Sequence, residues 1–432
     1  DFTIPSVNVL SFLNVSSNSM INPVFDGSNY PELTTLYIDS MPVMKTLEVT
    51  NTPNLLAFHA NENPVVTDAT ITRNSFIMAI NMQDCPNLVN ADYSDNQRAS
   101  SVNVKNDASL KTLKTDNTPL SKIDLTTNSS LTVLSMNNNR FTDFSAPYCT
   151  RLEKLSMTGN ELETLTLTNN TLLTDITVND NKLIVLDLSV QKSLRNLNCS
   201  SNLLTNVSGS TFTSSDYITT IFASNNKFTE FIITGKNLLK TVDLSDCNVL
   251  KTVTVTGNAV FENLDLSNDV ALITLDGYDN ALKTVDISSS SKLMYVHLQN
   301  NQISSINYDN CEAIVNMNLS KNLLTSFNPN TIGGSLKGLY ISENQLTTLD
   351  FTSTTSLQIL DCDNNALTSL TFNPSTDTPT SIEEVVNRLS AAPQLAYALD
   401  GNTTKMSRSA LTFDTFVAVD NYEDGFIKGT KA

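Results

Sequence analysis

Apolar and polar residues recur along most of the chain with a fixed period. Within each period apolar side chains stand at positions 1, 4 and 6 and an asparagine stands at position 9, the pattern L-x-x-L-x-L-x-x-N. Four successive units, separated by equal steps, begin LTVLSMNNN at Leu131, LEKLSMTGN at Leu152, LTDITVNDN at Leu173 and LRNLNCSSN at Leu194. Such a repeat predicts a solenoid, in which each unit forms one coil and stacking of coils buries the apolar positions.

The pattern extends in both directions, and the repeats cover residues 33–372. Two steps between units are longer than the others by about half a unit, the step from Leu55 to Leu88 and the step from Leu239 to Leu272. We interpret each long step as an extra half-coil. The remaining units begin at Leu110, Ile218, Leu293, Ile314, Leu336 and Leu357.

The second half of each unit carries its own L-x-x-L-x-L echo, as in LETLTLTNNTL from Leu162 and LKTVDISSSSK from Leu282. No helical periodicity is present in these halves. We therefore expect extended segments on both walls of each coil. The predicted fold class is an all-β-dominated solenoid, a leucine-rich-repeat rod of about fifteen coils stacked about 4.8 Å apart.

Asparagine at position 9 suits the tight turn after the strand, because its amide can donate to and accept from backbone groups. Stacked coils then bring these residues into a structural ladder. Cys247 stands at the ladder position of the Leu239 unit. The expected ladder comprises Asn63, Asn96, Asn139, Asn160, Asn181, Asn202, Asn226, Asn280, Asn301, Asn322, Asn344 and Asn365.

The two ends depart from the repeat. Residues 1–32 alternate apolar and polar side chains without the repeat pattern, which predicts an N-terminal β cap over the open edge of the first coil. After Phe372 the pattern stops, and Ser381 followed by Glu384 forms a capping box before a short helix. Residues 373–432 are therefore predicted to form a small α+β C-terminal cap.

Composition excludes several functions. The formal net charge is −18, from 26 Lys and Arg against 44 Asp and Glu, so the chain would repel a phosphate backbone and we expect no nucleic-acid partner. No run of eighteen apolar residues appears, so we expect no membrane insertion. The only histidines, His59 and His297, lie many coils apart. Because no nucleophile, zinc or phosphate-loop motif occurs, we expect no enzymatic activity, no catalytic residues, no cofactor and no metal.

Six cysteines fall at core-facing positions of the repeat, and successive ones are separated by whole coils. A disulfide needs Cα atoms within about 7 Å, so we expect none to form. The cysteines are Cys85, Cys149, Cys199, Cys247, Cys311 and Cys362.

Units such as LTDITVNDNKLIVLDLSVQKS from Leu173 and LKGLYISENQLTTLDFTSTTS from Leu336 resemble the short leucine-rich repeats of bacterial surface proteins, including the internalin-like group. The tail is loosely similar to elements of bacterial envelope and phage virion proteins. The resemblance implies adhesion or recognition of a protein or glycan on the strand face. It also implies a place outside the cytoplasm, at a cell surface or on a virion.

Positions 3 and 5 of each strand point away from the core, and we expect them to form two columns along one face. From Ile218 onward these columns become aromatic and acidic, which suits recognition. We therefore predict a non-enzymatic module that binds a protein or glycan, with an architectural subunit of a larger surface or virion assembly as the alternative. The candidate ligand-binding residues are Phe222, Asp243, Asp276, Tyr278, Tyr295, His297, Tyr340 and Asp361.

Overall fold

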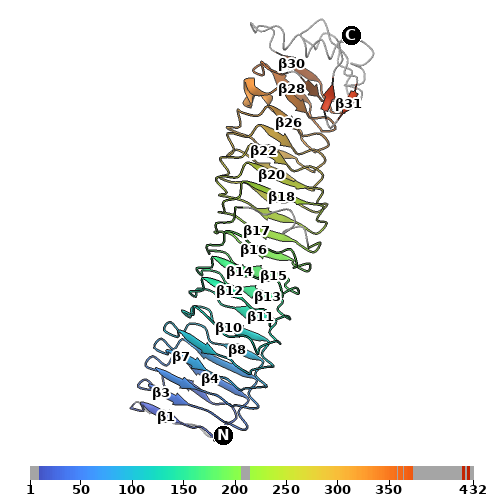
Figure 1. Ribbon diagram of the computed structural model, residues 1–432. Coiled ribbons are helices and arrows are strands. Elements are labelled where there is room, and N and C mark those ends of the chain that lie inside the picture. Colours follow the sequence, from blue (N-terminus) through green and yellow to red (C-terminus); the bar gives the residue numbers. More distant parts are fainter. Residues whose placement is uncertain are drawn as a thin grey trace. The chain divides into compact units, whose positions relative to one another are not determined.

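The computed structural model describes residues 9–205, 215–357, 359–362 and 364–372, together with two short strands at 421–423 and 426–428. The chain divides into two compact units, one comprising Asp1–Leu204 and Ser210–Ile221, the other Thr205–Gly209 and Phe222–Ala432. Each unit is a stack of coils joined by parallel strand pairing (Figure 1). The predicted solenoid with extended segments on both walls is therefore confirmed.

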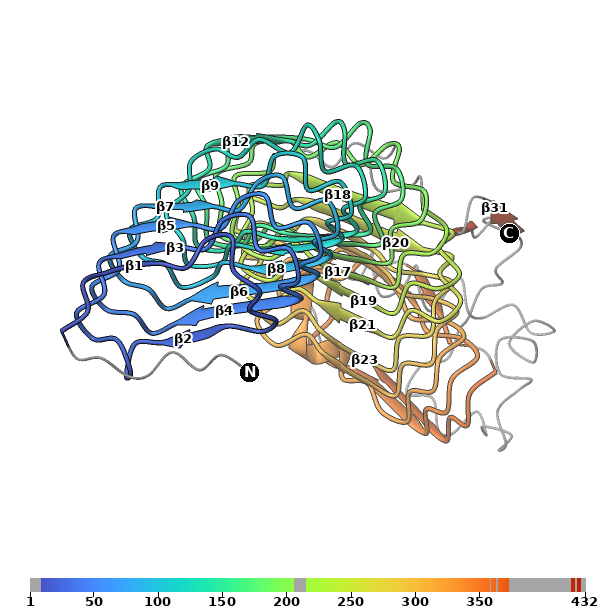
Figure 2. The ribbon, with the colours of Figure 1, turned by 90° about the horizontal axis from the view of Figure 1, so that it is seen from below.

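In the first unit each coil contributes strands to two walls (Figure 2). One wall holds β1 (Phe12–Asn14), β3 (Thr35–Tyr37), β5 (Ala57–His59), β7 (Ala79–Asn81) and β9 (Ser101–Asn103), and further along the pair β12 (Asp143–Ser145) and β14 (Thr164–Thr166). The other wall holds β2 (Val24–Asp26), β4 (Thr46–Thr50), β6 (Asp68–Thr72), β8 (Asn90–Asp92), β10 (Thr112–Lys114), β11 (Val133–Ser135), β13 (Lys154–Ser156), β15 (Asp175–Thr177) and β16 (Asn196–Asn198). Strand β17 (Thr220–Phe222) ends this unit and begins the next.

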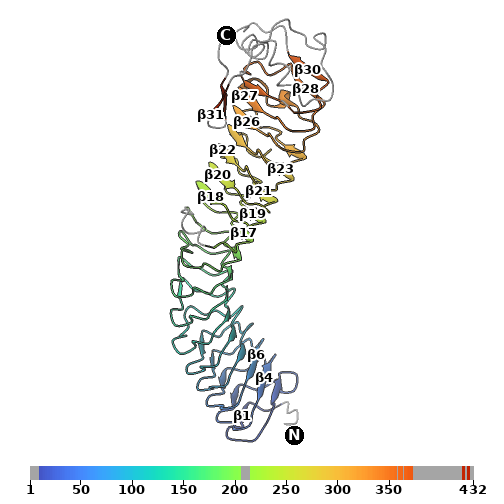
Figure 3. The same cartoon turned by 90° about the vertical axis from the view of Figure 1, so that its right-hand side faces the viewer.

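The second unit also has two walls of strands (Figure 3). A seven-stranded sheet contains β18 (Glu230–Thr234), β20 (Thr252–Thr256), β22 (Thr274–Asp276), β24 (Tyr295–His297), β26 (Asn316–Asn318), β27 (Gly338–Tyr340) and β29 (Ile359–Asp361). The opposite wall holds the pairs β19 (Thr241–Asp243) with β21 (Asn263–Asp265), β23 (Thr284–Asp286) with β25 (Ser305–Asn307), and β28 (Thr348–Phe351) with β30 (Ser369–Phe372). The other elements are the 3-10 turns η1 (Pro329–Thr331) and η2 (Gly333–Ser335) and the antiparallel pair β31 (Asn421–Glu423) and β32 (Phe426–Lys428).

The core runs between the two walls and is built from the central residue of each short strand. Leu134 pairs with Leu155, which pairs with Ile176 on the next coil, and all three are at most 2% exposed. Burying a side chain of this size contributes about 1.5–3 kcal/mol relative to leaving it exposed. Because each coil repeats this contact, neighbouring coils stabilise one another.

In many coils the turn after the strand has a left-handed residue directly before the ladder position. Asn138, Gly159 and Asp180 adopt φ values of 54°, 66° and 55°. Glycine, asparagine and aspartate tolerate this region better than other residues, which accounts for their frequency at position 8. The next residue then points its side chain under the turn, where it is buried.

The two predicted caps lie partly outside the described residues. Residues 9–32 contribute β1 and β2, which pair with β3 and β4 in the same parallel direction as the coils that follow. Residues 1–8 and the predicted helix after Ser381 lie outside the described part of the chain.

Candidate functional site

The ladder asparagines are held by one repeated set of hydrogen bonds. Asn181 donates from Nδ2 to the carbonyl oxygens of Met157 at 2.9 Å and Val178 at 3.1 Å, and its Oδ1 accepts from the Leu162 N–H at 3.0 Å. Asn322 makes the equivalent bonds to Leu298, Leu319 and Ile303. Each amide thus joins two coils. Other ladder asparagines likewise donate to one backbone carbonyl of their own coil and one of the preceding coil. They are Asn63, Asn96, Asn160, Asn202, Asn280, Asn301, Asn344 and Asn365. Asn139 and Asn226 have the same donor role.

The asparagines form two ladders, one on each wall, and not the single ladder expected, because Asn63 follows β5 and Asn96 follows β8 on opposite walls. The sequence interpretation also missed further members of the ladder that includes Asn63. In the first unit Asn128 donates to the carbonyls of Val104 and Asp107, and Asn170 donates to those of Ala146 and Cys149. The echo in the second half of each repeat was the signal for them. Both sets of turns are therefore built on the same principle.

The six cysteines lie in this buried framework. All are buried and no pair of them is joined by a disulfide, as their positions in the repeat predicted. The thiol of Cys247, at a ladder position, points to the carbonyl oxygen of Ala223 at 3.6 Å and so takes the donor role of the amide. These side chains serve the core.

The expectation of a single candidate face is wrong. Strand β19, which contains Asp243, and strand β22, which contains Asp276, lie on opposite walls (Figure 3). The error arose because strands on both sides of a long step were assigned to one face, although an extra half-coil carries the chain from one wall to the other. Phe222 lies on the same wall as Asp243, because β17 and β19 are neighbours in one sheet. Tyr295, His297, Tyr340 and Asp361 lie on the wall of β22.

On the wall of β22, neighbouring coils bring two candidate residues into contact. Asp276 and His297 are register partners, and Oδ1 of Asp276 lies 2.6 Å from Nδ1 of His297. Their side chains are 25% and 28% exposed. Tyr295, on the same strand as His297, and Tyr278, in the turn after β22, are half-buried. This pair satisfies its own hydrogen bond, which leaves it less available to a ligand.

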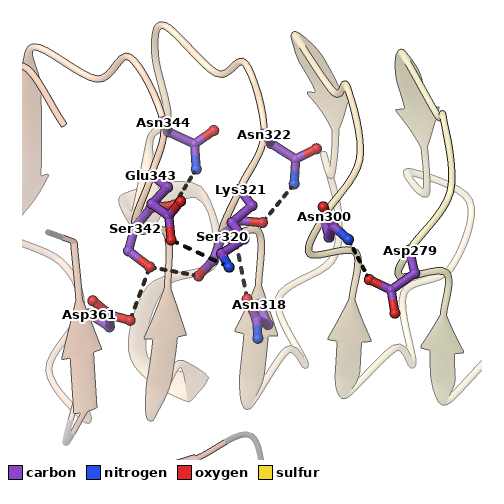
Figure 4. A network of polar contacts seen from close by, with 10 residues as sticks. All are labelled: Asp279, Asn300, Asn318, Ser320, Lys321, Asn322, Ser342, Glu343, Asn344 and Asp361. Atoms are coloured by element: carbon purple, nitrogen blue, oxygen red, sulfur yellow. Dashed lines mark hydrogen bonds and ion pairs between the residues drawn. The ribbon is translucent and has the colours of Figure 1, made fainter. Parts of the chain in front are cut away.

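Tyr340 is not an exposed platform, contrary to expectation, because it is only 2% exposed. Its Cε2 atom lies 3.7 Å from the place where a Cβ of Gly338 would stand, so the ring packs along a part of the strand that has no side chain. Asp361 accepts a hydrogen bond at 3.1 Å from Ser342, whose hydroxyl also bonds that of Ser320 (Figure 4). This end of the sheet is thus a polar network within the protein.

The other wall of the second unit carries a pocket of about 520 Å³ on its outer surface. Phe222, 41% exposed, lines it together with three aspartates that stand at equivalent positions of successive strands. These are Asp243, Asp265 and Asp286. The sequence interpretation named Phe222 and Asp243 but missed the other two, which belong to the echo halves FENLDLSND and LKTVDISSS.

The aspartates of this pocket are oriented by the residues that follow them. Oδ1 of Asp243, Asp265 and Asp286 each accepts the backbone N–H two residues ahead at 2.9 Å. The hydrogen bonds from Ser288 lower the pKa of Asp286. Among the described residues, none donates to Oδ2 of Asp243 or Asp265. The pocket is therefore acidic, and an exposed phenyl ring contributes to its lining.

Two further features bear on the chemistry of the site. No three histidine, cysteine or acidic side chains in the described ranges are grouped so that they could hold a metal ion. The described residues also include no helix with the length and apolar character needed to cross a membrane.

These coils define a parallel β-solenoid with leucine-rich-repeat-type turns. No family model and no curated protein matches the sequence. Among solved structures, the chain is similar to the functional domain of InlJ from Listeria monocytogenes, with 20% identity over 82% of this chain and 68% of that one and a TM-score of 0.32. It is also similar to a leucine-rich-repeat protein of Leptospira interrogans (20% identity, 76% and 91% covered, TM-score 0.34) and to YopM from Yersinia enterocolitica (18%, 85% and 88%, TM-score 0.33). Likeness at this level carries no inference about function.

Proposed function

We propose that this protein is a non-enzymatic recognition module that binds a protein partner through the acidic pocket of its second unit. The observation that supports the proposal is the exposed ring of Phe222 beside Asp243, Asp265 and Asp286 in a pocket on an otherwise regular strand surface. Aromatic anchors in partly enclosed sites dominate many protein interfaces. A rigid sheet presents such an anchor at little entropic cost.

The charge of the pocket selects the partner. Three aspartates and Glu262 line the pocket together with Phe222, and Lys283 forms a 2.6 Å ion pair with Glu262. A partner segment with lysine or arginine next to an aliphatic side chain would complement this surface. The net charge of −18 would also accelerate its approach.

We further propose that this recognition takes place outside the cytoplasm, at a cell surface or on a virion. The resemblance of the repeats to those of bacterial surface proteins supports this setting. Immunolabelling of intact cells and of purified particles tests it, and labelling only after cell lysis contradicts it.

The binding proposal is tested with an array of short peptides that combine lysine or arginine with aliphatic residues, next to acidic counterparts. We expect basic peptides to bind, more weakly as ionic strength rises. Phe222→Ala should weaken binding about thirtyfold, the effect of losing about 2 kcal/mol. Tyr295→Ala, which removes an aromatic side chain from the opposite wall, is the matched control.

Two results would contradict the proposal. Loss of binding in Tyr295→Ala with Phe222→Ala unchanged would place the site on the wall of β22. The absence of binding to any basic peptide, with co-purification in fixed stoichiometry with a larger particle, would favour an architectural subunit.

A further inference from the structure

A row of aromatic side chains lies on the outer surface of the first unit, on the wall of β1, β3 and β5. The ring centroids of Tyr37 and His59 are 4.9 Å apart with the planes 25° from parallel, and Phe12 lies 5.8 Å from Tyr37. Phe12 is 56% exposed and the other two are half-buried. Parallel pairing places Tyr37, His59 and Asn81 side by side on successive strands.

The polar side-chain atoms of this row make no hydrogen bonds to other side chains among the described residues. The Tyr37 hydroxyl, the His59 ring nitrogens and the Asn81 amide form no side-chain hydrogen bond with any described residue. The next asparagine of the same column, Asn103, differs because it donates to Gln83 at 2.7 Å. The row thus presents hydroxyl, imidazole and amide groups, each of which can both donate and accept.

The strands around the row, β1, β3, β5, β7 and β9, carry no acidic, lysine or arginine side chain. The outward residues of β1, β3, β5, β7 and β9 are aromatic, imidazole, amide, hydroxyl or alanine side chains. Because Ala57 and Ala79 are small, the strands in the middle of this surface carry little side-chain bulk. Beyond the strand ends, Oδ1 of Asp39 accepts the Asn61 N–H at 2.7 Å. The opposite wall of the same coils differs, since its strands carry Asp26, Glu48, Asp68, Asp92 and Lys114.

The size of the uncharged surface limits its ligand. Five strands about 4.8 Å apart, each with three residues of about 3.3 Å, cover roughly 200 Å². A stable protein interface needs about 800 Å² on each partner. A short, uncharged ligand rich in hydroxyl groups fits this area and this chemistry better than a protein surface does.

We propose that the surface of Phe12, Tyr37, His59 and Asn81 is a binding site for a neutral oligosaccharide. The aromatic rings offer apolar area to the C–H side of a sugar ring, and the free amide, hydroxyl and imidazole groups exchange hydrogen bonds with its hydroxyls. Acidic sugars are disfavoured, because the chain as a whole is strongly negative. This site is separate in sequence and in chemistry from the acidic pocket of the second unit.

The test is a glycan array followed by calorimetry with the full chain. The array carries short neutral oligosaccharides of glucose, galactose, mannose and N-acetylglucosamine, and sialylated and sulfated counterparts. We expect a neutral oligosaccharide to bind and the acidic ones to bind more weakly. Tyr37→Ala and Asn81→Ala should each lower its affinity about tenfold or more, the equivalent of about 1.4 kcal/mol.

Two controls separate this site from other effects. Thr70→Ala, on the opposite wall of the same coils, and Phe222→Ala, in the acidic pocket, should leave the affinity for the oligosaccharide unchanged. Tyr37→Phe keeps the ring and removes only the hydroxyl. It therefore tests the contribution of the hydroxyl to binding if Tyr37→Ala lowers the melting temperature. The proposal is overturned if no neutral oligosaccharide binds at millimolar concentration, if acidic ones bind better, or if Tyr37→Ala and Asn81→Ala leave binding unchanged.

Discussion

The backbone N–H of Cys85 donates a hydrogen bond of 2.8 Å to Oδ1 of Asp107, the ladder residue one coil further along. Cys247 and Asp269 repeat this relationship in the second unit, also at 2.8 Å. At most ladder positions the side chain is an amide, and its nitrogen donates to backbone carbonyls. In Asp107 and Asp269 the Oδ2 atom stands in place of that nitrogen, and it is buried without a partner among the described residues. A neutral carboxylic acid suits this place, whereas a carboxylate does not.

These two carboxyls should make the protein less stable as the pH rises. Burial raises the pKa of Asp107 to about 7 and that of Asp269 to about 8, with smaller contributions from Asp84 for the first and from Asp265, Asp246 and Asp243 for the second. Since the unfolded chain releases these protons near the ordinary value of 3.8, the folded state binds more protons between about pH 4 and pH 8. Their contribution to stability is complete below this range and is lost as the pH rises through it.

Urea unfolding as a function of pH measures this effect. We expect Asp107→Asn and Asp269→Asn to flatten the decline between about pH 4 and pH 8 and to be more stable than the parent chain above it. Asp309→Asn, at an exposed position, is the control and should keep the decline. A decline unchanged in the double variant Asp107→Asn, Asp269→Asn would show that these groups are not its origin.

The ladder amides should carry a measurable share of the free energy of unfolding. Asn181→Ala removes one acceptor and three donor contacts beneath a buried turn, which should cost about 1–3 kcal/mol. Thr171→Ala, at an exposed turn position nearby, should change stability by less than about 0.5 kcal/mol. Chemical denaturation of both variants compares them, and equal midpoints would contradict the structural role of the ladder.

The cysteines should be unreactive in the folded protein. Burial raises the pKa of Cys85 and Cys247 to about 12 and that of Cys149 and Cys311 to about 11, and the thiolate is the reactive form. A thiol reagent at mildly alkaline pH should therefore label the native chain slowly. In denaturant it should count all six cysteines. A count below six without reductant would reveal a disulfide that the structure does not contain.

Tyr340 should affect stability and not recognition. Because its ring is buried beside Gly338, Tyr340→Ala should leave a cavity and cost about 3–5 kcal/mol. Tyr295→Ala, at a half-buried position of the same sheet, should cost clearly less. Thermal unfolding of the two variants measures this difference. Equal losses would mean that the ring of Tyr340 is not packed as described.

The sequence by itself determined the solenoid, the phase of each strand and the turn position that the ladder asparagines occupy. These features depend on residues a few positions apart, such as Leu134, Met136 and Asn139, whose alternation and turn chemistry act within one coil. The prediction that both walls are extended followed from the same local pattern. The core positions of the cysteines followed from it as well.

Only the tertiary structure decided which residues share a surface. The two halves of each coil carry the same apolar pattern, so the pattern cannot say on which wall a strand lies, and Asp243 and Asp276 were assigned to one face. Lateral neighbours such as Tyr37 and His59 are chosen by the hydrogen-bond register between coils, which links residues a whole coil apart in the sequence. The burial of Tyr340 depends in turn on the missing side chain of Gly338. Contacts of this kind arise between coils, where no local pattern records them.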